Sequence, residues 1–178
     1  PRCVTFYENR IVYASTAHQP QTFWGSVTDD YYDFKTGEED PDSYSYTLAS
    51  PERNEILWVG NTQQLLIGTT GGEWVAAGND VDTSITPTSI QVRQHTSNGS
   101  IALRPMLLEG RIAYMQRGGR KLRAMDYDGA REQFKSEDLT ILSDHLTAGG
   151  VTSMAYQAQR DSNIWATNGN GQLIGMTY

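Results

Sequence analysis

The sequence predicts an all-β protein made of about four β-propeller-like antiparallel blades, with one short helix near residues 137–146. Many short segments alternate apolar and polar side chains, as half-buried strands do. The 178 residues include 17 Gly, 6 Pro, 10 Tyr and 4 Trp, which is typical of strands joined by tight turns. A strand–turn–strand unit also recurs at nearly regular intervals, so we expect one β-propeller-like domain over residues 1–178.

The clearest unit is EGRIAYMQRGGRKLRAMDY at residues 109–127, which predicts a hairpin of two strands over 111–116 and 121–127. Apolar and polar residues roughly alternate in both strands, so one face of the hairpin is expected to be buried and the other exposed to solvent. Between the strands, Gly118 and Gly119 supply the positive φ angles that a tight hairpin turn requires.

The same pattern recurs at residues 9–15, 64–69 and 163–168, each time followed by a turn and a second short apolar run. The equivalent positions are Ile11, Leu65, Ile112 and Ile164. Their spacings of 54, 47 and 52 residues are close to the roughly 40–50 residues per blade of known propellers. Few residues are identical between the repeats, so the prediction depends on the pattern of side-chain types.

In the first half of the chain, alternation predicts strands over 3–7, 10–15, 22–27, 43–50, 54–60, 63–69 and 73–78. Glu8 and Asn9 form the first expected turn, and Gly71 and Gly72 form another. The segment DDYYDFKTGEEDPDS at 29–43 has little apolar content after Phe34 and is expected to be an exposed loop. Residues 79–89 lack periodicity and are also expected to be a loop.

In the second half, strands are expected over 89–95, 101–108, 111–116, 121–127, 151–157, 162–167 and 172–178. The helix predicted over 137–146 has Ser136 as its N-cap and acidic residues in its first turn. Leu139, Leu142 and Leu146 would form one apolar stripe, and Gly149 with Gly150 would end the helix.

The charge pattern limits the classes of partner. A net charge of −7 argues against a protein whose main task is to bind the nucleic-acid backbone, because such binding needs a basic face. A local basic patch consists of Arg117, Arg120, Lys121 and Arg123, which indicates either a solvated turn or a contact with an acidic partner. The acidic loop does not follow the EF-hand order of ligands, which favours a solvated loop over a cation site.

Residues that carry chemistry are sparse. Cys3 is the only cysteine, expected to be a small buried group on a strand, and His18, His95 and His145 lie in three different segments. Motifs for nucleophilic, phosphate-binding or zinc chemistry are absent from the sequence. We therefore predict that the chain is not an enzyme and that it has no catalytic, cofactor-binding or metal-binding residues. Glycosidase chemistry stays open, because two of Asp29, Asp30, Asp126 and Asp128 could form a carboxylate pair. The sequence also contains no transmembrane segment.

Residues 1–26, PRCVTFYENRIVYASTAHQPQTFWGS, resemble the CVTFFEQRLVFAGT…QPQTIWGS stretch that is common in tail proteins of tailed bacteriophages. Further matches are SYTLAS at 45–50, LLIGTTGGEW at 65–74, QRGGRKLR at 116–123 and DLTILSDHLT at 138–147. Together these motifs span almost the whole chain in the expected order, and the first and fourth are the more specific. The chain thus resembles the tail nozzle or stabilisation proteins of short-tailed phages and prophages.

This resemblance implies a structural role in the virion, with the protein made in the bacterial cytoplasm and assembled into the phage tail. The family is built around β-propeller domains and forms rings at the end of the DNA-conducting tail. The implied partners are other tail proteins, further copies in a homo-oligomeric ring, and DNA passing nearby in the tail channel. Family members are several hundred residues long, so the chain is expected to be an internal fragment.

On this interpretation, ten apolar residues hold the blades together: Phe6, Ile11, Trp24, Trp58, Leu66, Trp74, Ile112, Leu122, Ile164 and Trp165. Two alternatives remain open. In the first, the chain is a carbohydrate-binding module on a tail tip that recognises host glycans through exposed aromatic residues and the acidic loop. In the second, it is a glycan hydrolase on the same scaffold. An exposed aromatic cluster beside Asp29–Asp33 would favour the former. A pair of carboxylates that converge in a pocket, one of them buried against an aromatic residue, would favour the latter.

Overall fold

The structure is a computed structural model that describes residues 1–79, 83–129 and 133–178; residues 80–82 of the expected 79–89 loop lie outside this part of the chain. The described residues form four antiparallel sheets, each made of strands that are consecutive in the sequence. The all-β prediction is therefore confirmed. No helix in these ranges is long and apolar enough to cross a membrane.

The first sheet contains β1 (Cys3–Tyr7), β2 (Arg10–Ala14), β3 (Thr22–Gly25) and β4 (Tyr44–Thr47). The second contains β5 (Ile56–Asn61), β6 (Leu65–Thr69), β7 (Glu73–Ala77) and β8 (Gln91–Thr96). The third contains β9 (Met106–Leu108), β10 (Arg111–Met115), β11 (Leu122–Asp128) and β12 (Gln133–Asp138). The fourth contains β13 (Val151–Gln157), β14 (Asn163–Asn168) and β15 (Leu173–Thr177).

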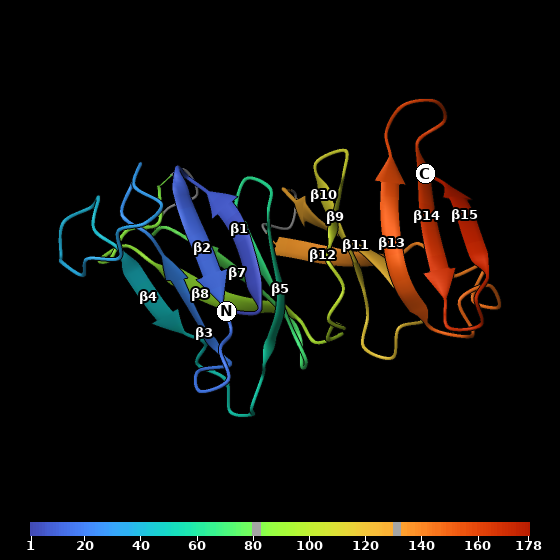
Figure 1. Cartoon of the computed structure of the whole chain (residues 1–178), viewed down its shortest axis with the longest axis horizontal. Coiled ribbons are helices and arrows are strands. Elements are labelled where there is room, and N and C mark those ends of the chain that lie inside the picture. The colour runs from blue at the N-terminus through green and yellow to red at the C-terminus, as the bar shows by residue number, and fades with distance from the viewer. Residues whose placement is uncertain (80–82, 130–132) are drawn as a thin grey trace.

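The sheets follow one another along the long axis of the molecule, so that the first and the fourth lie at opposite ends (Figure 1). The four positions proposed as equivalent from the sequence lie on β2, β6, β10 and β14, which is the second strand of each sheet. The repeat inferred from alternation therefore matches one sheet per repeat.

Alternation along the strands explains how the sheets pack, because successive side chains point to opposite faces. On β6, Leu65 and Ile67 pack in the core shared with the first sheet, whereas Leu66 packs in the core shared with the third. On β10, Tyr114 packs toward the second sheet and Met115 toward the fourth. The inner sheets are thus buried on both faces, and each pair of consecutive sheets shares one hydrophobic core.

The contact between the second and third sheets centres on Trp58, which is 2% exposed. Its ring lies 5.3 Å from the ring of Tyr114. On the neighbouring strand, Gly68 allows this close approach, since a Cβ at that position would overlap the Trp58 indole. A glycine within a strand often marks such a site.

The ten residues expected to hold the sheets together differ in burial according to the sheet that carries them. Six are buried between sheets: Trp58, Leu66, Trp74, Ile112, Leu122 and Ile164. The expectation is wrong for Phe6 and Trp165, which are 59% and 39% exposed. Ile11 and Trp24 are half-buried. These four exceptions belong to the first and fourth sheets, each of which has only one neighbour.

The predicted helix over 137–146 is wrong, and no helix occurs in the described residues. Glu137 and Asp138 instead complete β12, a strand that the sequence did not predict, by pairing with β11. The Asp138 carboxylate then accepts hydrogen bonds from the backbone and hydroxyl of Thr140, at 2.9 and 2.8 Å, which favours a turn. Of the expected apolar stripe, Leu139 packs against the core between the third and fourth sheets, whereas Leu142 and Leu146 are 94% and 42% exposed.

Strand β9 is shorter than the expected strand over 101–108. The preceding residues cross from the second sheet to the third: the Ser100 N–H donates to the Thr69 carbonyl at 2.8 Å, and the Ile101 N–H donates to the Met115 carbonyl at 3.1 Å. The predicted turn between the first two strands is confirmed. Glu8 and Asn9 have φ angles of 48° and 57°, as a two-residue hairpin turn requires.

Candidate functional site

The acidic loop between β3 and β4 is anchored by one buried cation. The Arg10 side chain, 3% exposed, donates to the carbonyl oxygens of four loop residues. These acceptors are Ser26 at 2.6 Å, Pro41 at 3.3 Å, Asp42 at 2.7 Å and Asp40 at 2.6 Å. The guanidinium also lies 5.4 Å from the ring centroid of Tyr44, and burial lowers the pKa of Arg10. One side chain therefore holds both ends of the loop.

Several carboxylates of this loop shape its backbone. Asp30 accepts the Tyr32 N–H at 3.0 Å, and Asp33 accepts the Lys35 N–H at 2.8 Å. Such bonds are typical of Asx turns. In the part of the chain that the structure describes, no group of three or more His, Cys, Asp or Glu residues is arranged to hold a metal ion. The cation around which this loop folds is the Arg10 guanidinium, which binds the loop carbonyl groups.

The first sheet exposes apolar side chains on the face that points away from the second sheet. Cross-strand pairing places Val4 opposite Tyr13, Phe6 opposite Ile11, and Tyr13 opposite Trp24. Residues directly opposite each other share a face of the sheet. We call these five residues, together with the loop residues Tyr31, Tyr32 and Phe34, the N-terminal end face.

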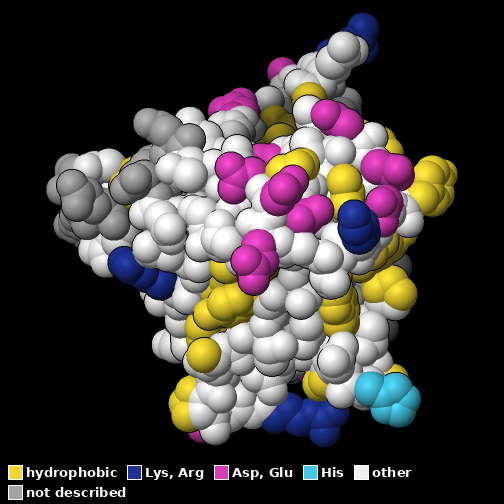
Figure 2. Space-filling model, turned by 90° about the vertical axis from the view of Figure 1, so that its left-hand side faces the viewer, with side chains coloured by type: hydrophobic (Ala, Val, Ile, Leu, Met, Phe, Trp, Pro, Cys, Tyr) yellow, Lys and Arg dark blue, Asp and Glu magenta, His cyan; other side chains and the backbone are white. Residues whose placement is uncertain are grey.

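The loop aromatics extend this surface and fix part of it. The Tyr31 ring packs edge-on against Phe6 at 5.3 Å, and Phe34 packs against Tyr13 at 5.9 Å. Tyr32 is 96% exposed and Val4 is 55% exposed. Figure 2 views this end of the molecule and shows acidic side chains gathered in its upper part, with hydrophobic side chains among and below them. The surface combines exposed aromatic area with negative charge.

At the opposite end of the molecule, the fourth sheet partly exposes Trp165. Trp165 is opposite Ala155 on β13 and Gly175 on β15, and its indole N–H donates to Gln157 at 2.8 Å. Leu173 is 69% exposed on the same face. The small neighbours leave the indole ring lying over Gly175, where a Cβ would come within 2.9 Å of it.

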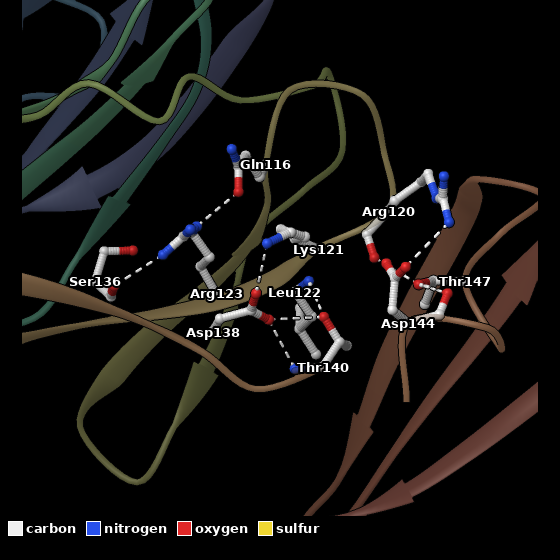
Figure 3. Close-up of polar contacts among 10 residues, drawn as sticks. All are labelled: Gln116, Arg120, Lys121, Leu122, Arg123, Ser136, Asp138, Thr140, Asp144 and Thr147. Atoms are coloured by element: carbon white, nitrogen blue, oxygen red, sulfur yellow. Dashed lines mark hydrogen bonds and ion pairs between the residues drawn. The ribbon is translucent and has the colours of Figure 1, made fainter. Parts of the chain in front are cut away.

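The basic patch predicted from the sequence is largely paired within the chain (Figure 3). Arg120 lies 3.1 Å from Asp144, and Lys121 lies 3.1 Å from Asp138. Arg123 donates to the Gln116 side chain at 2.7 Å and to the Ser136 carbonyl at 2.9 Å. These contacts favour a structural role for the patch over contact with an acidic partner.

The histidines and aspartates considered for catalysis are spread over several parts of the structure. His95 packs against Phe134 at 5.4 Å and accepts its backbone N–H at 3.4 Å, and burial lowers the pKa of His95. His18 and His145 are exposed. Asp29 and Asp30 belong to the first sheet's loop, whereas Asp126 and Asp128 lie on β11 of the third sheet, and Asp126 pairs with Arg111 at 3.2 Å. The four aspartates therefore fall into two groups, one in the loop of the first sheet and one on β11 of the third sheet.

Cys3 is half-buried against the first core, close to the expected environment. Burial raises the pKa of its thiol to about 11, so the thiol is protonated at neutral pH. A reactive thiolate is therefore not part of this end of the molecule.

Sequence reasoning missed the most deeply buried carboxyl group. Glu73 begins β7 and is 0% exposed. It accepts hydrogen bonds from the hydroxyls of Thr96 and Ser100, the latter at 2.9 Å. Burial raises the pKa of Glu73, opposed by these hydrogen bonds, by the Tyr114 hydroxyl and by the charge of Arg123. Because the carboxyl is enclosed, we assign it to the contact between the second and third sheets.

We expect Glu73→Gln to remove part of the pH dependence of stability. The pKa of Glu73 is raised in the folded chain above its ordinary value of 4.5, so the protonated carboxyl favours folding. This contribution is complete below about pH 4.5 and is lost as the pH rises through the raised pKa. Glu73→Gln should gain stability relative to the wild type over that rise, by about 1.4 kcal/mol per unit of pKa difference. Urea unfolding between about pH 4 and 8 measures this gain.

Glu52→Gln, which removes a carboxylate from an exposed loop, is the matched control. A constant free-energy difference between the wild type and Glu73→Gln across the pH range would contradict the prediction, since it would mean that Glu73 does not titrate on folding.

No known protein-family model matches this sequence, and no curated protein matches it. The resemblance to phage tail proteins therefore stays a prediction from the motifs quoted above.

Proposed function

We propose that this chain is a structural component of a phage or prophage tail, of the nozzle or tail-stabilisation kind, and that it acts through protein–protein contacts. On this proposal its sheets are blades of an open, propeller-like arc within a ring of copies. The tail assignment derives from the sequence motifs. The observation that supports a contact role is the N-terminal end face, where Phe6 is 59% exposed and Tyr32 is 96% exposed.

Physical chemistry favours binding at such a surface. Contiguous exposed apolar patches typically mark interaction sites, and aromatic residues are enriched in interfaces. Because Arg10 holds the loop in place, Tyr31 and Phe34 already pack against the first sheet before another protein binds. A surface that is ordered before binding loses less conformational entropy when it associates. The net charge of −7 suits a component near DNA, since it repels the duplex.

Mass spectrometry of purified tailed particles tests the proposal. We expect the protein in the particles, and we expect the double variant Phe6→Ser/Tyr32→Ser to lower its incorporation at least about tenfold, because exposed aromatic anchors dominate interfaces. Ile141→Ser is the control, since Ile141 is 75% exposed on the loop after β12, outside the N-terminal end face. Particles that lack the protein would contradict the tail assignment. Unchanged incorporation of the double variant would contradict the contact surface.

One observation favours a second candidate, a carbohydrate-binding module on a tail tip. Tyr31, Tyr32 and Phe34 are exposed beside the acidic residues of the loop, and aromatic rings beside polar groups suit the faces of sugar rings. A glycan array with the purified chain distinguishes the two functions. Specific glycan binding that is lost in Tyr32→Ser and retained in Ile141→Ser would favour the carbohydrate-binding module.

A further inference from the structure

The side chains of the third and fourth sheets leave a cavity of about 210 Å³ between them. Its walls come from β10 and β11 on one side, from β13, β14 and β15 on the other, and from the loop of residues 139–150. Met115 and Leu122 on the first wall are 2% and 6% exposed, and Ile164 on the second wall is 2% exposed. The cavity therefore extends into the core that the two sheets share.

A small side chain on the inner face of the fourth sheet accounts for the space. Ala166 of β14 lies between its cross-strand partners, Met154 of β13 and Ile174 of β15, and all three residues line the cavity. Residues directly opposite each other share a face of the sheet. Because the alanine side chain ends at Cβ, it leaves a space between these two longer neighbours. A larger residue at this position would fill the cavity.

The loop that forms the side wall is attached to both sheets. The Thr147 hydroxyl donates to the carbonyl of Arg120, in the turn between β10 and β11, at 2.5 Å, and the Arg120 side chain pairs with Asp144 at 3.1 Å (Figure 3). The Asn168 side chain of β14 donates to the Leu146 carbonyl at 3.3 Å. The cavity is thus formed before any ligand binds, which lowers the entropic cost of binding.

The lining favours an uncharged, apolar occupant. Among the described residues that line the cavity, none is charged and most are aliphatic residues or methionine. Three of the five methionines are among them: Met115, Met154 and Met176. Methionine side chains are flexible and polarisable, so they adapt to occupants of different shape.

Water is a poor occupant of this cavity, because a buried water needs about two to four polar partners. The Thr140 hydroxyl already donates to Asp138 at 2.8 Å and accepts the Leu122 N–H at 3.3 Å, and the Thr147 hydroxyl is bonded to a backbone carbonyl. Ser143 is then the one lining residue whose hydroxyl makes no hydrogen bond within the described chain. A water would therefore gain fewer hydrogen bonds than it needs.

We propose that this cavity is a binding site for a small uncharged molecule with a hydrocarbon body, such as an aromatic ring with a short alkyl chain. Apolar cavities of about 150 Å³ bind benzene, so a cavity of about 210 Å³ accommodates a somewhat larger molecule. Leu146 is the most exposed side chain of the lining, at 42%, which places the opening beside the loop. The site lies apart from the N-terminal end face and is independent of the proposed function.

Nuclear magnetic resonance of the full chain, labelled at its methionine methyl groups, tests the proposal with benzene, toluene and ethylbenzene as probes. The resonances of Met115, Met154 and Met176 should shift, because an aromatic ring then lies beside them. Met125 is the internal control, since it packs in the core between the second and third sheets. Affinity should rise about fourfold for each carbon added from benzene to ethylbenzene, the contribution of one buried CH₂ group.

Ala166→Leu should abolish these shifts, because the added atoms occupy the cavity. Ala155→Leu is the matched control and should retain them, since Ala155 is exposed and lies opposite Trp165 on the other face of the sheet. Circular dichroism checks that both variants fold.

The wild-type titration decides the question even if Ala166→Leu does not fold. The proposal would be overturned if the three methionine resonances did not move at the solubility limit of benzene, or if Met125 moved equally with them. Equal shifts in the two folded variants would also overturn it, since the probes would then bind elsewhere.

Discussion

Arg10→Met is expected to lower the free energy of unfolding by at least about 1–3 kcal/mol, the cost of leaving a buried carbonyl group without its donor. The buried guanidinium donates to carbonyl groups of Ser26, Asp40, Pro41 and Asp42. Methionine fills similar volume but donates nothing, so these acceptors lose their charged partner. The loop should also become more sensitive to proteolysis, because both of its ends depend on this side chain. Urea unfolding followed by tryptophan fluorescence measures the stability.

Arg2→Met is the matched control for this change. Arg2 pairs with Glu55 at 2.6 Å, but both side chains are substantially exposed, at 49% and 34%. Exposed ion pairs contribute at most about 1 kcal/mol. If Arg10→Met cost no more than Arg2→Met, the loop would not depend on Arg10 and the anchoring role would be wrong.

Leu66→Ala is expected to cost about 2–5 kcal/mol, the range for a buried leucine whose site cannot fully collapse. Leu66 is 0% exposed and packs in the core that joins the second and third sheets. The neighbouring side chains on β6 point to the first sheet, so they cannot move to fill the gap. Thermal and urea unfolding measure the loss.

Leu107→Ala on β9 removes the same atoms from a side chain that is 55% exposed, and we expect a loss below about 1 kcal/mol. Comparable losses for the two leucines would mean that the second and third sheets do not share a core in solution.

The strands and tight turns were largely predictable from the sequence, because they depend on neighbouring residues. Alternation identified most strands, and Glu8 with Asn9 identified a hairpin turn whose positive φ angles the structure shows. The helix over 137–146 was wrong because a leucine spacing that fits a helix also occurs in a loop. Leu142 and Ile141 in that segment are solvent-exposed.

Burial at the ends of the molecule was not predictable, since it depends on which sheets have two neighbours. Phe6 and Trp165 have the same local pattern as buried residues such as Trp58. The roles of Arg10 and Glu73 were missed for a related reason. Their hydrogen-bond partners are at least 16 residues away in sequence, and no local motif marks either residue as buried.

Small-angle X-ray scattering tests the central claim, that four sheets pack face to face in chain order and leave two ends open. We predict a pair-distance distribution with an extended tail, as an elongated row of sheets gives (Figure 1). A compact, symmetric distribution, as a closed disc with the first and fourth sheets in contact would give, would contradict it.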